Sequence, residues 1–533
     1  MPGHLPGLPY RNQSLHAAYG GNGFCRLIWF YLLYVVVWYV MKRKLYLNTV
    51  TSLLMQVTTI ICGFILPRFL LDNFGSEVNG LTQSITQFLG IITFMELGVG
   101  QVIQSALYKP LSQGNVEWTS RIIKSGTRYF RKIAYGLLLY VLILLVAFPY
   151  ITGYQFDWLY TAVLILAISV DAFSRFYFGM IDKILLSADQ KGYVQYIAQI
   201  LTVLLNTIVV VLVICAGCSI QFVKICSAAV FLLNPLIIRW YIHRHYQINR
   251  HIKYQGEPIQ QKWNGIAQHV SAVVLEGTDN IVLTLFATLS DVSVFSVYFM
   301  VISGIRQLYV SITGGIQSMV GALWAKKEIV KLERFFYGIE VVLHFLVVFL
   351  FSCIAVLIVP FVQVYTNGLT DADYTQPLFA AILTLAYGMR CLRTPYNILI
   401  LAGGHYKQTQ SCHIVAAVLN IVISVISVAY WGLVGVAIGT LVAFSYQTIW
   451  MALYNSRNLL KWHIGRIAKQ FLVDFFTAIA ILLATSGFGL RTVSYLGWIR
   501  MAVPVALIAF GITAIAALLF YRQPLKSLLH YKK

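Results

Sequence analysis

Charged side chains are scarce in this sequence, and carboxylates are the scarcest of them. Of the 533 residues, 11% are charged and only 18 are Asp or Glu, whereas 59% are hydrophobic. A soluble chain of this length needs far more charge to cover its surface, so the composition excludes an ordinary soluble enzyme. An excess of apolar sequence on this scale is typical of a protein with many membrane-spanning segments.

Motifs for nucleotide and metal binding are missing too. The sequence has no G-x-x-x-x-G-K-[ST] segment and no connection long enough for a folded domain, which excludes a pump carrying its own ATPase domain. The eight cysteines lie mostly in apolar segments, and the one close pair, Cys215 and Cys218, has neither a second pair nor a histidine nearby. We therefore expect no metal, no resident cofactor and no catalytic set.

Fourteen apolar segments follow Met41, each near the roughly 20 residues that a helix needs to cross a bilayer. Helices are expected because open strand edges cannot be satisfied in lipid. The predicted spans are 47–66, 79–103, 133–152, 158–180, 193–216, 221–240, 266–289, 294–316, 338–360, 377–401, 410–430, 432–453, 470–488 and 498–520. The sequence thus predicts an all-α integral membrane protein.

Lys and Arg fall on alternate connections between these spans. One side of the membrane receives 29 of them, and the other receives only Arg68, Lys224 and Arg491. Because basic residues stay on the cytoplasmic side, both ends of the chain from Met41 are expected in the cytoplasm. The formal net charge of +21 therefore reflects topology and contact with anionic lipid, and it does not require nucleic acid.

Residues 1–40 depart from the pattern of spans. They begin Gly/Pro-rich, and their apolar run, 27–40, is about half a span long. Arg11 and Arg26 precede that run, so a cleaved signal is one interpretation. Met41, however, opens MKRKLYLNTV, a basic cap directly before a full-length span. We interpret residues 1–40 as an extension that is either non-essential or mis-assigned, with Met41 as the natural start.

The sequence repeats itself weakly at an offset of 214 residues. This shift places Val78 on Val292 and Asn206 on Asn420, and it superposes the first six spans on the next six. Both halves begin inside, so the repeat predicts two six-helix lobes related by a pseudo-twofold along the membrane normal, with the substrate site between them. The predicted organisation is an extension (1–40), an N-lobe (41–240), a cytoplasmic loop (241–265), a C-lobe (266–453), and two further spans with a cytoplasmic tail (454–533).

Arginines inside the spans are candidate ligands for an anion. Arg306 has no carboxylate nearby in its span, and Arg390 and Arg393 share a helix face at i,i+3. The planar guanidinium binds two phosphate oxygens at once and stays charged, so arginines lining a cavity suit a phosphate group. Arg175 has Asp171 one turn earlier on the same face, which favours local pairing.

Carboxylates inside a span are costly and therefore informative. Glu276 and Asp279 share a face of the seventh span, where two roles stay open. They pair with an arginine such as Arg306, or they exchange a proton or a sodium ion, with Asn280 as a co-ligand of the cation. Glu96 lies near the inner end of the second span. Exposure to water or pairing with another helix is at least as expected there as a role in ion binding.

Three segments carry a resemblance to a known family. They are ILPRFLLDNFGSEVNGLTQSITQFLGIITFMELGVG (65–100), LYKPLSQGNVEWTSRIIKSG (107–126) and TDNIVLTLFATLSDVSVFSVYFMV (278–301). From Met41 onward the chain resembles the polysaccharide and O-antigen flippases of the multidrug/oligosaccharidyl-lipid/polysaccharide exporter superfamily.

The resemblance implies a two-lobed bundle of helices in the bacterial cytoplasmic membrane. Such a protein moves a sugar chain on a polyprenyl diphosphate from the inner to the outer leaflet by alternating access, beside a polymerase and assembly proteins. Cavity arginines belong to this picture. Arg306 matches them best, and Arg68, after Pro67 at the outer end of the first span, would lie at the cavity mouth.

Two other functions stay open. A multidrug exporter of the same superfamily would bind organic cations through its carboxylates, but the spans hold more candidate arginines than carboxylates. A membrane polymerase or glycosyltransferase would need a sizeable outer loop, and the longest one, 361–376, is short. Asp371 and Asp373 in that loop resemble a metal–nucleotide DxD motif, yet no nucleotide sugar is available outside the cell.

Overall fold

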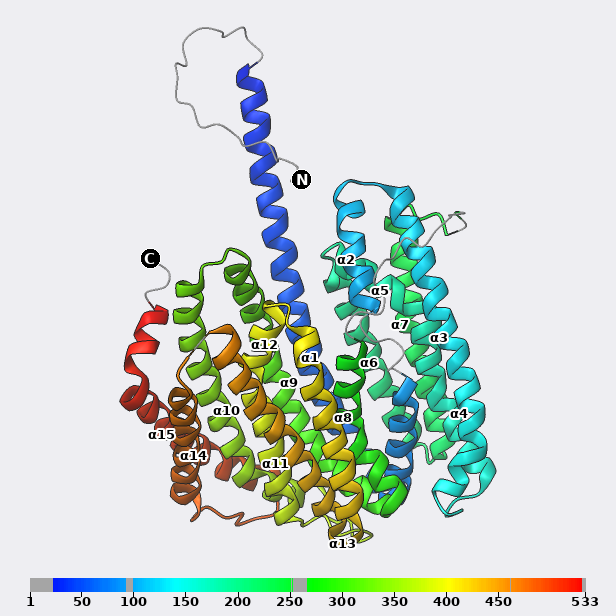
Figure 1. The fold of residues 1–533 in the computed structure, drawn as a ribbon. Helices are drawn as coiled ribbons and strands as arrows, with labels where there is room; N and C mark the ends of the chain where they lie inside the picture. Colours follow the sequence, from blue (N-terminus) through cyan, green and yellow to red (C-terminus); the bar gives the residue numbers. More distant parts are fainter. Residues whose placement is uncertain (1–22, 93–98, 251, 253–265, 461, 530–533) are drawn as a thin grey trace.

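The computed structural model of the chain describes residues 23–92, 99–250, 252, 266–460 and 462–529 (Figure 1). Within these residues all regular secondary structure is helical, which confirms the predicted fold class. The helices are α1 (Gly23–Gly90), α2 (Val99–Ser112), α3 (Val116–Ile151), α4 (Trp158–Ser174), η2 (Arg175–Gly179), α5 (Met180–Ala188), α6 (Gly192–Cys215), α7 (Ile220–His245), α8 (Ile266–Phe286), α9 (Leu289–Ala325), α10 (Ile329–Tyr365), α11 (Pro377–Leu392), α12 (Thr394–Ala402), α13 (Tyr406–Tyr454), η3 (Asn455–Leu459), α14 (Ile464–Thr485) and α15 (Tyr495–Leu529).

The number of membrane spans differs from the prediction. In the described part of the chain, 10 helical segments are long and apolar enough to cross a membrane, so the predicted count of fourteen is not confirmed. Of these segments, Tyr46–Gly90 holds one predicted span and about half of the next, and Lys407–Leu459 holds two. They are broken at Gly75 and Gly432, where φ is +78° and +51°. Glycine adopts positive φ without the steric cost that a side chain brings.

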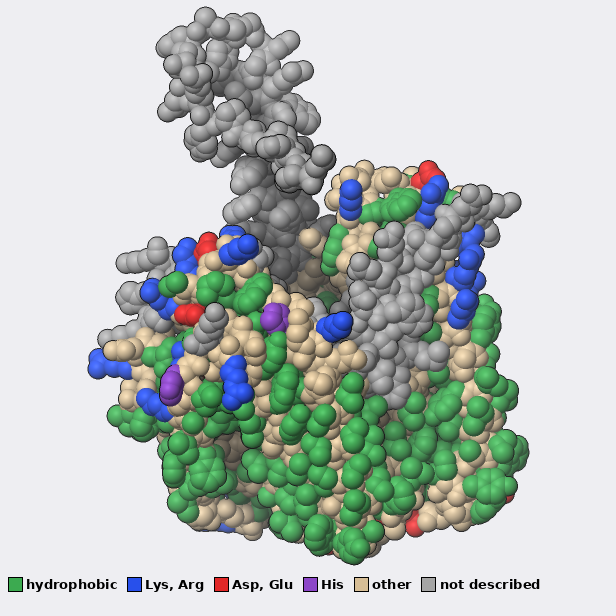
Figure 2. Space-filling view, in the orientation of Figure 1, with side chains coloured by type: hydrophobic (Ala, Val, Ile, Leu, Met, Phe, Trp, Pro, Cys, Tyr) green, Lys and Arg blue, Asp and Glu red, His purple; other side chains and the backbone are tan. Residues whose placement is uncertain are grey.

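The helices form two lobes that lie side by side (Figure 1). The first is built from α2 to α7 and the second half of α1, around buried residues such as Leu81, Phe130 and Leu185. The second is built from α8 to α13, around residues such as Tyr298 and Phe444. The first half of α1 contacts both lobes, through α6 and α9, while α14 and α15 pack on α10 outside the second lobe. In Figure 2, Lys and Arg gather at one end of the molecule, above a broad apolar band.

The two lobes meet at the end with few basic residues, which we call the outer end. Asn79 Nδ2 donates to Ser293 Oγ over 2.7 Å, and the hydroxyls of Ser84 and Thr284 lie 2.8 Å apart. Asp371, in the loop between α10 and α11, accepts from the backbone N–H and the hydroxyl of Ser76 just after the break in α1. The outer seam is the set Ser76, Asn79, Ser84, Thr284, Ser293 and Asp371. Its hydrogen bonds hold the lobes together at this end.

One bond of the outer seam joins equivalent positions of the repeat. Asn79 and Ser293 are 214 residues apart, the offset at which the sequence repeats itself. A twofold axis between two lobes brings equivalent residues into contact where they lie close to the axis. The bond between Asn79 and Ser293 is a contact of this kind. Beside it Gly80 lies so close to α9 that an added Cβ would stand 1.8 Å from the carbonyl oxygen of Leu289. Glycine therefore allows the two backbones to touch.

We expect Gly80→Val to push the lobes apart at the outer end, because overpacking a close contact costs about 1–3 kcal/mol. The variant should unfold at a lower temperature than the wild type, and a cysteine placed at the outer seam should react faster with a water-soluble maleimide. Gly63→Ala on the same helix is the control, since a Cβ there meets nothing within 4 Å. Equal labelling and equal thermal stability of both variants would show that the close approach does not hold the seam.

Candidate functional site: an arginine-lined pocket in the second lobe

Three of the arginines predicted to bind substrate line one cavity of about 220 Å³, which we call the arginine pocket. Arg306 comes from α9, Arg390 from the end of α11, and Arg393 from the junction of α11 and α12. Thr313 and Asn397 are among the polar residues that complete its lining. The cavity is smaller than a drug-sized pocket, so it suits a head group and not a whole lipid.

A proline lies beside two of these arginines within the predicted span 377–401. The helix continues through Arg393, which has φ and ψ of −67° and −25° and bonds to the backbone of Met389 and Asn397. Pro395, the second residue of α12, has no N–H to donate to the carbonyl oxygen of Cys391, which accepts from the Tyr309 hydroxyl over 3.0 Å instead. Arg390 and Arg393 are therefore carried, three residues apart, by one nearly continuous helix.

The charge of the arginine pocket suits an anion. Its described lining contains three guanidinium groups and no carboxylate. The Arg390 guanidinium also lies over the Phe444 ring, 5.2 Å from the centroid, which supports its position by a cation–π contact. The Oδ1 atom of Asn397 is buried and has no hydrogen-bond partner among the described residues, so the amide is available to a ligand.

The other two predicted substrate ligands lie elsewhere. Arg175 Nη2 is 2.8 Å from Asp171 Oδ2, which confirms the local pairing, and both line a separate cavity of about 180 Å³ in the first lobe. Arg68 pairs with Asp72 at 2.9 Å and donates to the carbonyl oxygens of Tyr365 and Asn367. These contacts tie α1 to the outer end of α10. Neither arginine is in the lining of the arginine pocket.

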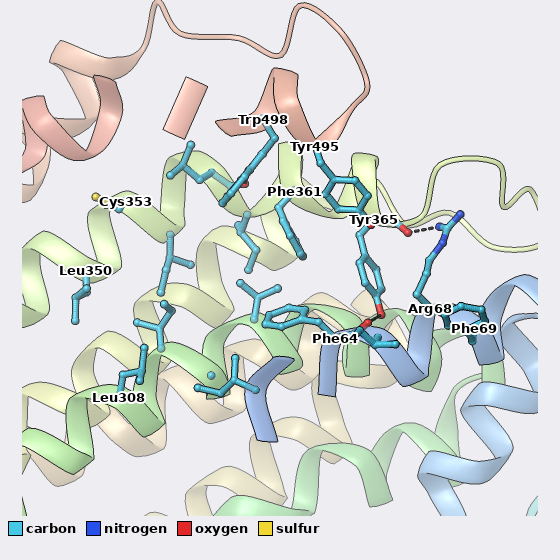
Figure 3. A pocket seen from close by; sticks show the side chains of 18 residues that line it. Phe64, Arg68, Phe69, Leu308, Leu350, Cys353, Phe361, Tyr365, Tyr495 and Trp498 are labelled. Atoms are coloured by element: carbon cyan, nitrogen blue, oxygen red, sulfur yellow. Dashed lines mark hydrogen bonds between the residues drawn. The ribbon is translucent and has the colours of Figure 1, made fainter. Parts of the chain in front are cut away.

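A larger apolar groove of about 550 Å³ lies between α1, α9, α10 and α15 (Figure 3). Its labelled residues include Phe64, Leu308, Phe361 and Trp498, with Arg68 at one end. On α9 the groove is lined by Val301, Gly304, Ile305 and Leu308, and the arginine pocket by Arg306, Val310, Thr313 and Gln317. At 3.6 residues per turn these two sets face opposite sides of the helix, so α9 separates the groove from the pocket.

Asp279 lies at a buried cluster of oxygen atoms within the second lobe. It is 2% exposed, and its Oδ1 accepts from the Thr440 hydroxyl over 2.7 Å, while Thr440 accepts from Asn420 Nδ2 over 3.0 Å. Asp279 Oδ2 and Asn420 Oδ1 are buried without a hydrogen-bond partner among the described residues. The hydroxyl of Ser424 donates to the carbonyl oxygen of Val436 close by, over 3.3 Å. We call these five residues the oxygen cluster.

The structure gives only partial information on the other residues predicted to bind an ion, Asn280, Glu276 and Glu96. Asn280 is half-buried, and its Oδ1 is buried without a hydrogen bond in the described structure, but the residues bonded around Asp279 come from α13. Glu276 belongs to α8, but its side chain is outside the described part, as is the whole of Glu96. The roles expected for these two carboxylates stay predictions.

Sequence reasoning missed several buried polar residues. Asn420 and Thr440 flank the break at Gly432, and Glu340, His344 and Asp474 are almost fully buried in other helices. The rule that a charged residue within a span is a functional candidate would have found the last three, since each lies in a predicted span. Thr440 and Asn420 are uncharged, so this rule would not have found them.

The fold is shared with known transporters. The chain superposes on the lipid II flippase MurJ in its inward closed conformation with a TM-score of 0.67, at 15% identity, covering 90% of this chain and 99% of the flippase. It also superposes on a multidrug resistance MATE family transporter of the MOP superfamily in its inward-facing conformation (TM-score 0.59, 14% identity, 77% of this chain and 98% of the transporter). A third match is a MATE transporter of Vibrio cholerae (TM-score 0.51, 14% identity, 78% and 96%).

These likenesses establish the fold of MOP-superfamily transporters for this chain. At 15% identity or less, they concern the fold alone. No protein-family profile matches the sequence, and no curated protein matches it either. The residues of the arginine pocket therefore have to carry any argument about the substrate.

We expect inorganic pyrophosphate to bind the arginine pocket and to stabilise the purified protein. Binding to the folded state alone raises the free energy of unfolding by RT ln(1 + [L]/Kd), so the midpoint of thermal unfolding should rise with the pyrophosphate concentration. Arg306→Gln and Arg393→Gln should remove this rise.

Arg175→Gln is the matched control, because it removes an arginine that is paired in the other lobe. Sodium chloride at equal ionic strength controls for salt. If the two pocket variants respond to pyrophosphate as the wild type does, the arginine pocket does not bind phosphate groups.

Proposed function

We propose that this protein translocates a polyprenyl-diphosphate-linked oligosaccharide across the cytoplasmic membrane for the synthesis of a cell-surface polysaccharide. The observation that supports it best is the convergence of Arg306, Arg390 and Arg393 on one cavity whose described lining has no carboxylate. A diphosphate is a small group with several oxygens in fixed positions, which the planar guanidinium recognises well.

The apolar groove is a candidate site for the lipid half of the substrate. It is almost wholly hydrophobic, and it lies on the opposite face of α9 from the arginine pocket. An isoprenoid chain in this groove would lie along apolar side chains such as Leu308 and Phe361, and it would have to pass around α9 to reach a head group held at the three arginines (Figure 3). The chain would then remain in lipid-like surroundings, and only the diphosphate and the sugars would need a polar path.

The membrane potential supplies part of the driving force. A diphosphate diester carries two negative charges, and each charge leaving a negative-inside cell gains about 2.3 kcal/mol per 100 mV. This gain acts in the direction of export. The proposed transporter therefore needs no nucleotide-binding domain, in agreement with the missing P-loop.

Transport of organic cations is the alternative, since two of the superposed structures are MATE transporters. The arginine pocket argues against it, because three guanidinium groups repel a cation. Only Asp279, inside the oxygen cluster, offers a buried negative charge among the described pocket and cluster residues.

The test is transfer of a fluorescent polyprenyl-diphosphate-linked oligosaccharide between the leaflets of proteoliposomes. We expect the wild type to transfer it and Arg306→Gln to slow transfer by about ten- to a hundredfold, because each lost charge-assisted hydrogen bond costs about 1.5–3 kcal/mol. Arg175→Gln should keep the wild-type rate. No transfer by the wild type, together with export of ethidium from the same vesicles, would favour the multidrug alternative.

We further propose that the oxygen cluster at Asp279 holds a coupling cation, Na⁺ or H⁺, with Na⁺ favoured. Carboxylate, amide, hydroxyl and carbonyl oxygens from α8 and α13 meet there, and hard cations prefer oxygen ligands. Two of these oxygens have no hydrogen bond in the described structure, so a cation would satisfy them.

We expect sodium chloride, compared with choline chloride at equal concentration, to raise the midpoint of thermal unfolding of the wild type. Asp279→Asn and Asn420→Ala should remove the difference. Asn206→Ala is the matched control, because Asn206 is the equivalent of Asn420 in the repeat and bonds only to Ser227 in the described structure. If sodium has no effect on the wild type while a pH gradient drives transport, the coupling ion is a proton.

A further inference from the structure

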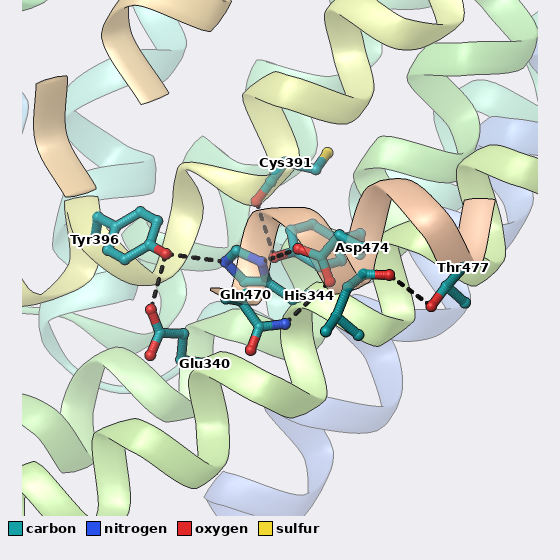
Figure 4. Close-up of polar contacts among 9 residues, drawn as sticks. Glu340, His344, Cys391, Tyr396, Gln470, Asp474 and Thr477 are labelled. Carbon is teal, nitrogen blue, oxygen red and sulfur yellow. Dashed lines mark hydrogen bonds and ion pairs between the residues drawn. The ribbon is translucent and has the colours of Figure 1, made fainter. Parts of the chain in front are cut away.

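A second buried cluster of titratable groups lies outside both the arginine pocket and the oxygen cluster (Figure 4). Glu340 and His344 come from α10, Tyr396 from α12 and Asp474 from α14, and their exposed fractions are 3%, 0%, 1% and 4%. We call these four residues and Arg466 the proton cluster. It joins α14 to the second lobe, and no step proposed above uses it.

The hydrogen bonds of the cluster fit a protonated His344 beside two ionised carboxylates. Its Nδ1 lies 2.6 Å from Asp474 Oδ2, which accepts the Nδ1 hydrogen when the carboxylate is ionised. The hydroxyl of Tyr396 lies 2.8 Å from Glu340 Oε1 and 3.3 Å from His344 Nε2. When this hydroxyl donates to Glu340, Nε2 donates to the hydroxyl, and both ring nitrogens carry a hydrogen.

The charges of the cluster cancel in this state. Glu340 and Asp474 are negative, and His344 and Arg466 are positive, so the four sum to zero. The Arg466 guanidinium is 3.9 Å from Glu340 and lies over the rings of Tyr337 and Trp462, with centroids at 3.3 and 3.5 Å. Loss of one proton from His344 would leave a net negative charge in a site that water hardly reaches, which is costly unless the site rearranges.

Two charged groups act directly on His344, Asp474 of α14 and Glu340 of α10. The hydroxyl of Tyr396 faces it from α12. Arg466 of α14 lies near Glu340, together with Glu333 and Tyr337 of α10, and Lys469 lies over the ring of Tyr521 of α15.

Tyr396 connects the proton cluster to the arginine pocket. It is the third residue of α12, and its neighbours Arg393 and Asn397 both line that pocket. Its carbonyl oxygen accepts from Asn455 Nδ2 over 3.1 Å, so both ends of the residue are anchored in the interior. A change in the hydroxyl contact of Tyr396 would therefore move the turn that carries Arg393.

We propose that His344 is a proton-binding site that controls the arginine pocket, an inference that rests on the proposed function of that pocket. When a proton leaves Nε2, the neutral nitrogen becomes an acceptor and takes the hydroxyl hydrogen bond of Tyr396 away from Glu340. Glu340 then lacks that donor, and the two carboxylates outnumber Arg466. The Tyr396 hydroxyl bonds to His344 instead, one turn along α10, and the start of α12, which carries Arg393, shifts with it. The pocket binds its anion well only while His344 is protonated.

The experiment measures affinity against pH in the purified full-length protein. The probe is farnesyl-diphosphate-linked N-acetylglucosamine, a diphosphate diester whose own charge is constant from about pH 6 to about pH 9. We expect the wild type to lose affinity by about tenfold or more as pH rises through this window, as for the loss of one hydrogen bond to a charged group. His344→Gln, which cannot gain a charge, should bind with an affinity that does not depend on pH.

Three further variants make the outcome decisive. Tyr396→Phe keeps the buried ring and removes the hydroxyl link, so it should also abolish the pH dependence, and it serves if His344→Gln does not purify as a single species. His413→Gln alters another buried histidine, which lies 2.9 Å from the amide of Gln447, and should keep the wild-type dependence. Arg306→Gln should bind poorly at every pH.

The outcomes separate the two proposals. If the wild type binds no probe at any pH, the proposed function fails. If the wild type binds and both His344→Gln and Tyr396→Phe keep its pH dependence, or if wild-type affinity does not fall with rising pH, the proton site is overturned while the arginine pocket stands.

Discussion

The membrane interior offers no water to solvate a charge, so each charged side chain within a span needs partners supplied by the protein. This constraint organises the molecule. Arg306, Arg390 and Arg393 are gathered at one cavity. Asp279 accepts a hydrogen bond from Thr440 and interacts electrostatically with Arg390, and His344 interacts with two carboxylates. Each group lies where side chains from several helices meet, because a single helix supplies only the partners on its own face.

Equivalent positions of the sequence repeat differ in charge between the two lobes. At the 214-residue offset the positions of Arg306, Asp279 and His344 in the second lobe correspond to Ile92, Ile65 and Phe130 in the first. Arg393, between α11 and α12, corresponds to Gly179 at the end of the π-helical turn η2. The charged residues proposed to bind an anion, a cation and a proton therefore have uncharged counterparts in the first lobe.

Much of the fold followed from hydropathy and charge. Apolar segments of about 20 residues have to be helices in lipid, and the same-direction repeat led to two lobes. Hydropathy did not give the observed span count, because Gly75 and Gly432 interrupt the regular helix within longer helical segments. Predicted contacts were right where they were local, as for Arg175 with Asp171, which are one turn apart. They were incomplete where partners are distant, as for Asp279 with Thr440, which are 161 residues apart.

By itself, the sequence determined the all-helical membrane class, the repeat and the identity of the arginines, since these depend on residue type and on spacing along the chain. Only the tertiary structure decided which arginines share a cavity and which are tied to carboxylates or to backbone carbonyls. It also decided that α14 is joined to the second lobe through His344 and Asp474. The physical reason is that Coulomb interactions and hydrogen bonds act over a few ångströms in space, and separation along the chain does not specify that distance.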